Sequence, residues 1–188
     1  TETASSPEET QASTSVPTEE DYERLTQRLT NMEDIVVEDV QLLTDEGRIT
    51  IFNLPDQVGN CVQIFRAIAQ GGIVVDMIVQ NLTPNGAELS FSAPKQDLDL
   101  ALKLTREATA KLGGNIRVTR EDDIAKLIVL GVGMRTHTGV ARKMFGALAA
   151  KNININLINT SEVRISVVVD GEQGEQALAC LKEAFNLK

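Results

Sequence analysis

The chain has 188 residues, 42% of them hydrophobic and only 3% aromatic, and a formal net charge of −9. This length allows one ordinary domain or two small ones, with a core built from aliphatic side chains. No cluster of Lys or Arg offsets the negative charge, so a phosphate backbone or an anionic membrane surface would repel the protein. The few aromatic side chains leave little for bases to stack on. We therefore expect neither nucleic acid nor a membrane as a partner.

The chain carries two cysteines, Cys61 and Cys180, and one histidine, His137. Both cysteines fall on the apolar stripe of a predicted helix, where Cys packs as a small hydrophobic side chain. A single His is too few for an ordinary Cys/His metal site, so we expect no metal and no cofactor. No apolar run approaches the ~20 residues of a membrane span, and no signal peptide is visible. We expect a cytoplasmic protein, and the start at Thr1 rather than Met indicates a piece of something larger.

The first twenty residues are mostly Ser, Thr, Glu and Pro, with almost no large apolar side chains. Such a segment cannot offset the entropy that ordering would cost. We predict a disordered tail or linker over residues 1–30, although residues 20–32 are also compatible with a short helix.

A regular pattern begins at residues 35–43, which predict a strand, followed by a turn at 45–47. Residues 48–53 alternate apolar and polar side chains, as a half-buried strand does. A loop over 54–59 then enters a helix whose apolar side chains recur at helical spacing, and two glycines end it at Gly71 and Gly72.

The next segment completes a first module. Residues 73–81 and 87–93 predict two strands joined by a hairpin turn, residues 98–112 a helix, and residues 116–119 a closing strand. The order is β-α-β-β-α-β, the split βαβ arrangement of ferredoxin-like folds.

The same order then starts again. Strands are predicted at 126–130, 155–161 and 163–169, and a loop over 131–139 leads into a helix. A last helix carries an apolar stripe from Ala177 to Phe185. Identical residues recur at a spacing of 80 positions (139 − 59 = 80), which indicates internal duplication: Gly59 and Gly139, Phe65 and Phe145, Ile78 and Ile158.

The second copy ends after its second helix and lacks a fourth strand, while the strand at 35–43 is one too many for the first copy. An open sheet edge would be costly, so we predict that the early strand completes the second sheet. The predicted class is α+β, with two ferredoxin-like modules. The first covers 48–120, and the second is discontinuous and covers 35–44 plus 124–188.

In each module the loop after the first strand enters a helix through a glycine, at residues 56–59 and 136–139. The first turn of such a helix exposes free backbone N–H groups, which suit a carboxylate. The facing strand would carry the groups for the other end of a small zwitterion. An Asp or Thr before a helix is also an ordinary N-cap, and the polarity of the facing strand could be that of a loop edge. The polar residues of the two facing strands are Asp76, Gln80 and Asn81 in the first copy and Asn152, Asn154, Asn156, Ser161 and Glu162 in the second.

Four strings carry a resemblance to a known family. They are Leu54-Pro-Asp-Gln-Val-Gly59, Gly131-Val-Gly-Met-Arg-Thr-His-Thr-Gly139, Asn152-Ile-Asn-Ile-Asn and Thr160-Ser-Glu-Val-Arg-Ile-Ser-Val-Val-Val169. Together they resemble the paired ACT domains of bacterial aspartate kinases, over roughly residues 35–188. The likeness is to the regulatory β subunit, or the regulatory C-terminal half, of the enzymes that lysine and threonine inhibit. One departure stands in the first string, where Val58 replaces the usual Pro and would loosen the loop.

The resemblance implies a regulatory pair that binds threonine, lysine or both as a small amino-acid ligand. It would relay feedback inhibition, within lysine and threonine biosynthesis, to a kinase domain or subunit. The ligand would lie between modules, often from the two chains of a homodimer. The residues that match the family's effector positions are Asp56, Gly59, Gln80, Asn81, Asn152, Asn154 and Ile155 for one site and Met134, His137, Thr138, Gly139, Ser161 and Glu162 for the other.

We find no activated nucleophile, phosphate loop or paired carboxylates in the sequence, so no catalytic activity is expected of this chain. A lone His in a loop, such as His137, is by itself most often a surface residue. The alternative to an effector-binding regulator is a dimerisation scaffold that has lost effector binding.

Overall fold

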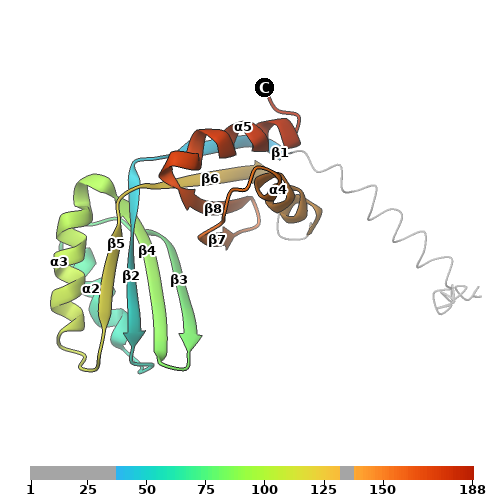
Figure 1. The fold of residues 1–188 in the computed structure, drawn as a ribbon. Helices are drawn as coiled ribbons and strands as arrows, with labels where there is room; N and C mark the ends of the chain where they lie inside the picture. Colours follow the sequence, from blue (N-terminus) through green and yellow to red (C-terminus); the bar gives the residue numbers. More distant parts are fainter. Residues whose placement is uncertain (1–36, 132–137) are drawn as a thin grey trace, which may run out of the picture. The chain divides into compact units, whose positions relative to one another are not determined.

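The computed structural model of the chain describes residues 37–131 and 138–188, and it contains two four-stranded antiparallel sheets (Figure 1). The predicted tail over 1–30 and most of the predicted loop over 131–139 lie outside the described residues. All described residues belong to one compact unit. The predicted α+β class with two modules is confirmed.

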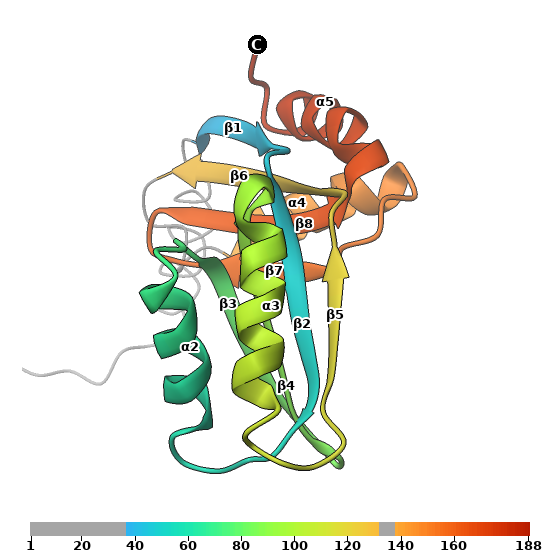
Figure 2. The same cartoon turned by 90° about the vertical axis from the view of Figure 1, so that its left-hand side faces the viewer.

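The first sheet has the strand order β3-β4-β2-β5. Helices α2 and α3 cover one of its faces (Figure 2). Neither of these helices covers the other face, which we call the open face. Alternation along β2 places Ile49 and Ile51 under the helices, completely buried, while Arg48 and Thr50 point to the open face. The elements are β2 (Glu46–Leu54), α2 (Asn60–Gln70), β3 (Asp76–Thr83), β4 (Gly86–Pro94), the 3₁₀ turn η1 (Lys95–Asp97), α3 (Leu98–Thr109) and β5 (Arg117–Glu121).

The second sheet has the order β1-β6-β8-β7. Its core is aliphatic, with Leu127, Val129 and Val167 of the sheet packed against Met144 and Leu181 of the helices. The elements are β1 (Val37–Leu43), β6 (Ile124–Gly131), α4 (Thr138–Ala150), β7 (Leu157–Thr160), β8 (Arg164–Asp170), the 3₁₀ turn η3 (Gly171–Gln173) and α5 (Gly174–Ala184).

Strand β1 belongs to the second sheet, although it precedes the first module in the sequence. It pairs antiparallel with β6, with Val40 opposite Val129. Val37 and Val40 are buried in the core of the second module. The predicted completion of the second sheet by the early strand is therefore confirmed.

The turn predicted at residues 45–47 is confirmed only at Asp45, where the chain bends. Strand β2 already begins at Glu46, and Gly47 is paired with Ala93 of β4. A Cβ atom on Gly47 would overlap Leu98 Cδ1 and lie 2.7 Å from the carbonyl oxygen of Glu121. Glycine is present because α3 and β5 approach the strand closely here, not because the chain turns.

We expect Gly47→Ala to lower the free energy of unfolding by about 2 kcal/mol, because a backbone oxygen held in the sheet cannot move aside. Gly146→Ala is the matched control. The new Cβ in α4 would meet nothing within 4 Å, and Ala in a helix is favoured over Gly by about 0.5–1 kcal/mol. Urea denaturation of both variants checks the prediction, and a neutral Gly47→Ala would contradict it.

Candidate functional site

The loop before α2 is closed by its own hydrogen bonds. The Asn60 side-chain amide donates to the carbonyl oxygen of Pro55 at 2.7 Å, and the Gln57 backbone N–H donates to the same oxygen at 2.9 Å. Gly59 is the N-cap, with φ at 96°, and it makes no side-chain capping bond. Val58, in the family's Pro position, is fully exposed. The Asn60 N–H donates to the carbonyl oxygen of Gln57 at 3.3 Å. No side chain caps the first turn of α2 at Gly59, so the N–H groups of Cys61 and Val62 are the donors that this helix terminus offers to an anion.

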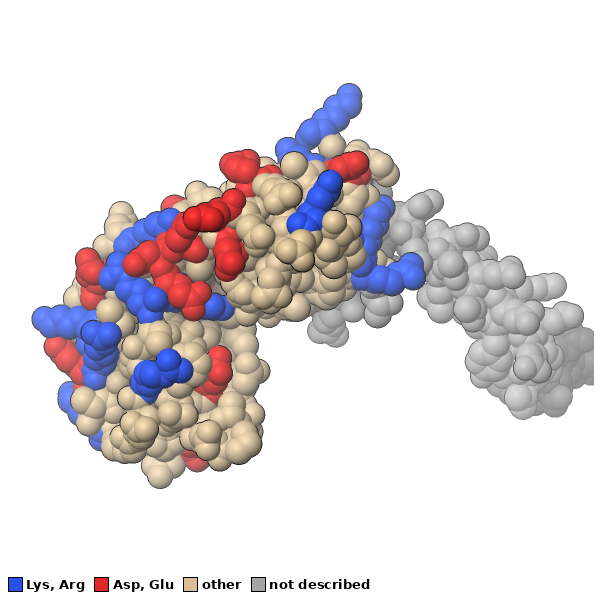
Figure 3. All heavy atoms as spheres, in the orientation of Figure 1, with Lys and Arg blue, Asp and Glu red and all other residues tan. Residues whose placement is uncertain are grey.

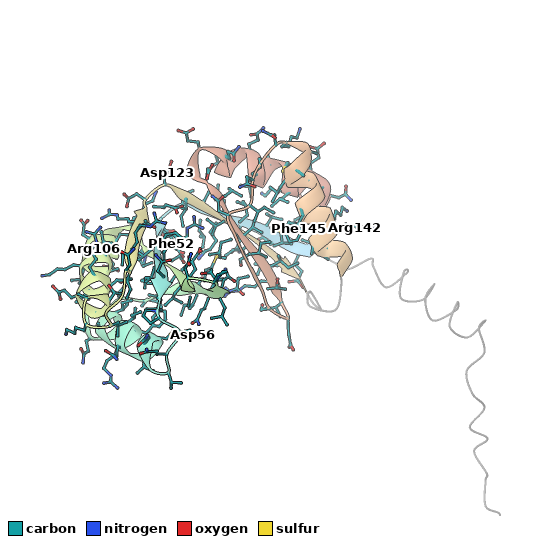
Figure 4. All side chains as sticks on the ribbon, turned by 60° about the horizontal axis from the view of Figure 1, so that its bottom comes forward. Phe52, Asp56, Arg106, Asp123, Arg142 and Phe145 are labelled. Carbon is teal, nitrogen blue, oxygen red and sulfur yellow. The ribbon has the colours of Figure 1, made fainter. Side chains whose placement is uncertain are left out.

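Strand β3 lies beside this helix terminus. The Cys61 thiol, in the first turn of α2, donates to Gln80 Oε1 at 3.2 Å. The structure thus brings Gln80 next to the loop that carries Asp56 and Gly59, as predicted. Asp56 is exposed in this loop (Figure 4).

Asn81 lies on the other face of the same strand. Gln80 is paired with Leu89, which faces the helices, whereas Asn81 is paired with Glu88, which lines a cavity on the open face. A bulge between Asp76 and Val79, with Met77 at φ 45°, shifts the alternation by one residue. Asp76 and Asn81 consequently share one face and Gln80 the other, a separation that the sequence does not reveal.

The cavity has a volume of about 380 Å³ and lies between the open face of the first sheet and residues 155–158 of the second module. Arg48 forms hydrogen bonds of 2.7 and 2.6 Å with both carboxylate oxygens of Glu121. Its Nη1 donates to the carbonyl oxygen of Asn156 at 3.4 Å. Of the residues that match the family's effector positions, Asn81 and Ile155 line this cavity, and so does Asn156 from the polar set of the second module.

The predicted Asn-rich residues of the second module lie before β7 rather than in it. Asn152 has φ at 57°, and Gly72, its equivalent in the first module (152 − 72 = 80), has φ at 73°. Asn is tolerated in this left-handed conformation after a helix. Asn154 donates to Asn156 Oδ1 at 3.3 Å. The strand predicted from residue 155 begins only at Leu157, so this polarity belongs to a loop edge.

The second predicted site is described only in part. Met134 and His137 lie outside the described residues. Helix α4 begins at Thr138, so Gly139 lies within its first turn instead of ending the loop. On the facing side, Ser161 forms a tight turn after β7, in which its backbone N–H donates to the carbonyl oxygen of Arg164 at 2.8 Å. Glu162 is exposed in that turn.

Sequence reasoning did not single out Lys126, which is only 2% exposed. Its ammonium donates to the Glu46 carboxylate and, at 3.0 Å, to Asp76 Oδ2. Both carboxylates belong to the first module, and Lys126 belongs to the second. A lysine within the apolar run Ile124-Ala-Lys-Leu-Ile-Val was the available signal, because a buried charge requires a partner.

Asp76 has a depressed pKa. Partial burial by itself would raise it, but the Met77 backbone N–H, the hydrogen bond and charge of Lys126, and the charge of Arg164 together outweigh burial and hold the pKa of Asp76 below its usual value. A lowered folded pKa gives stability that is present above the unfolded pKa and lost as the pH falls through the folded one.

We therefore expect Asp76→Asn to destabilise the protein above about pH 4, the ordinary Asp pKa. The difference from the wild type should shrink as the pH falls further, because the wild-type carboxylate becomes protonated. Urea denaturation at several pH values from about pH 2 to pH 7 measures this. If the difference in stability between Asp76→Asn and the wild type stays constant over this pH range, the lowered pKa of Asp76 is refuted.

Over the described residues, no group of three or more His, Cys, Asp or Glu side chains could hold a metal ion. No helix in the described part of the chain is long and apolar enough to cross a membrane. Figure 3 shows Lys and Arg interspersed with Asp and Glu on the visible face.

Comparison with known proteins gives consistent matches. Residues 127–185 match the ACT domain family. The aspartokinase of Pseudomonas aeruginosa is 37% identical over 158 residues, which are 84% of this chain and 38% of that protein. The chain thus spans well under half of such full-length relatives.

Solved structures agree with the sequence matches. The ligand-free regulatory subunit of aspartate kinase from Thermus thermophilus is 38% identical, with a TM-score of 0.73 over 79% of this chain and 98% of that one. Escherichia coli aspartokinase III, solved with lysine and aspartate, is 22% identical with a TM-score of 0.61 over 80% of this chain and 33% of that one, and shares the fold. With its two ACT-type sheets and this likeness over nearly a whole regulatory subunit, the chain belongs to the regulatory ACT-domain family of aspartate kinase.

Proposed function

We propose that this chain binds amino-acid effectors, threonine, lysine or both, and relays feedback inhibition to an aspartate kinase domain or subunit. The observation that carries the proposal is the uncapped N-terminus of α2 with Gln80 beside it. Such a terminus supplies N–H donors for an α-carboxylate. Asp56 and the Gln80 amide offer oxygens for an ammonium group. Aspartokinase III, solved with lysine, supports the ligand class.

The effector would reach this site from the free edge of the first sheet. Strand β3 pairs only with β4, and β7 only with β8, among the described residues. Both edges carry exposed apolar side chains, Ile78 and Leu82 on β3 and Ile158 on β7, which are 50%, 69% and 45% exposed. Apolar edge strands are templates for pairing with another chain. They support a homodimer in which a second copy closes the ligand site.

Inhibition would follow from differential affinity. An amino acid held between modules stabilises the arrangement that disfavours the kinase, and it shifts the equilibrium only as far as it prefers that state. The remaining parts of the proposal, a role in lysine and threonine biosynthesis and a cytoplasmic location, rest on the family.

Isothermal titration of the chain with threonine and with lysine tests the proposal. We expect Gln80→Ala to weaken effector binding by about three- to tenfold, the loss of one hydrogen bond. Gln70→Ala is the matched control, because Gln70 is exposed at the opposite end of α2. An effector at a free concentration of about 100 times its Kd should raise the free energy of unfolding by about 2.7 kcal/mol.

The outcomes separate the alternatives. Binding of neither amino acid by a stable dimer would favour the dimerisation scaffold over the sensor. Equal weakening by Gln80→Ala and Gln70→Ala would place the effector elsewhere. Kinase activity from this chain alone would overturn both functions.

A further inference from the structure

A set of charges around the buried Lys126 joins the two modules where β2 and β3 begin. Lys126 of β6 pairs with Glu46, the first residue of β2, and with Asp76, the first residue of β3. Arg164 of β8 adds a second cation, 3.8 Å from Asp76. Two carboxylates of one module thus meet two cations of the other, and we call these four residues the junction.

A second contact crosses between the modules in the opposite direction. Arg48 of the first module donates to the carbonyl oxygen of Asn156 in the second. Asn156 is the equivalent of Asp76 in the duplication (156 − 76 = 80). Each module therefore holds the other at equivalent positions, at the start of the strand that forms its free edge.

Apolar packing reinforces this arrangement. Met77 and Leu157, the residues that follow these two positions, lie in one buried cluster with Ile124 and Val168. The cluster fills the space between the starts of β3 and β7. Neither edge strand can shift without disturbing the other, because packed interiors do not deform continuously.

We propose that Lys126 is a positioning residue that couples the two edge strands, β3 and β7, into one two-state element. Among the described residues, the Lys126 ammonium donates to Glu46 and Asp76, neither of which is among the residues that match the family's effector positions. It acts through Asp76, four residues before Gln80 on β3. The measurement of effector affinity rests on the proposed function. The measurement of unfolding rests only on the contacts of the junction.

The first test needs no ligand and uses the full chain in a scanning calorimeter. We expect one cooperative transition for the wild type, and two for Lys126→Met, which keeps the length of the side chain and removes the charge. Lys103→Met is the control, since Lys103 is 70% exposed on α3. Its profile should remain a single transition. Two transitions in the wild type, or one in Lys126→Met, would overturn the coupling.

The second test measures affinity. We expect Lys126→Met to weaken threonine or lysine binding about fivefold or more, the usual size of coupling between sites, while Lys103→Met leaves it unchanged. Should Lys126→Met fail to fold, Glu46→Gln and Asp76→Asn each remove one arm of the junction and should weaken binding by smaller factors. Unchanged affinity in all three variants would refute the positioning role. If the wild type binds neither amino acid, the proposed function fails while the calorimetric result still decides the coupling.

Discussion

Lys126→Ala is expected to lower the free energy of unfolding by about 3 kcal/mol. The substitution leaves two carboxylates facing each other without their cation, and removing one partner of a buried ion pair costs about 3–5 kcal/mol. The lower end applies because Asp76 is 39% exposed and keeps contact with water, whereas Glu46 is 16% exposed. A shift of roughly 6–12 °C in Tm should accompany the change in a chain of this size.

Guanidinium denaturation followed by circular dichroism measures this effect, as the free energy of unfolding summed over the transitions, and two controls interpret it. Lys103→Ala removes an exposed cation from an i,i+4 pair with Glu107 and should change stability by less than about 0.5 kcal/mol. Lys126→Met combined with Glu46→Leu replaces a buried pair by apolar side chains and should recover much of the loss. A cost below about 1 kcal/mol for Lys126→Ala would mean that the ammonium is not buried in solution.

Phe91→Ala should cost about 4 kcal/mol, a value in the range for truncating a buried aromatic side chain. Phe91 is completely buried on the central strand β4, opposite Ile49 of β2. Its ring meets Phe65 of α2 edge to face, with centroids 5.6 Å apart. The truncation therefore leaves a cavity between the sheet and the helix that carries the proposed effector loop.

Phe52→Ala is the matched control for that prediction. Phe52 lies on the open face of the same sheet, half-buried, with the Arg117 guanidinium 4.1 Å from its ring centroid. Its loss leaves no enclosed cavity and should cost about 1 kcal/mol. Denaturant unfolding compares the two variants. Similar costs at both positions would show that the helix layer is not tightly packed over Phe91.

Local pattern was enough to predict much of this protein. The alternation along residues 48–53 and the helical spacing after Gly59 are properties of short segments, and both produced the elements that the structure has. The count of strands also predicted that β1 completes the second sheet, because an edge left open has a physical cost wherever it lies. The ends of the helices and strands were predicted less accurately. The helix predicted to residue 112 ends at Thr109.

The candidate site was predictable in composition but not in geometry. Gln80 contacts Cys61 in the first turn of α2, the helix that follows the loop with Asp56 and Gly59, because this turn and the facing strand are neighbours in the module. Asn81 does not join Gln80, since adjacent residues of a strand point to opposite faces, and the bulge at Met77 places Asp76 on the face of Asn81 and not on that of Gln80. A one-residue shift in alternation moves every later side chain to the other side of the sheet, and no periodicity within β3 signals it.

The duplication, the α+β class and the borrowed strand follow from the sequence by itself, because each depends on periodicity or on a count of elements. Only the tertiary structure decided the partners of Lys126 and the need for glycine at Gly47. Both depend on contacts between residues far apart in the chain, 80 positions for Lys126 and Glu46. Such contacts leave no local pattern, because they arise only when separate elements pack together.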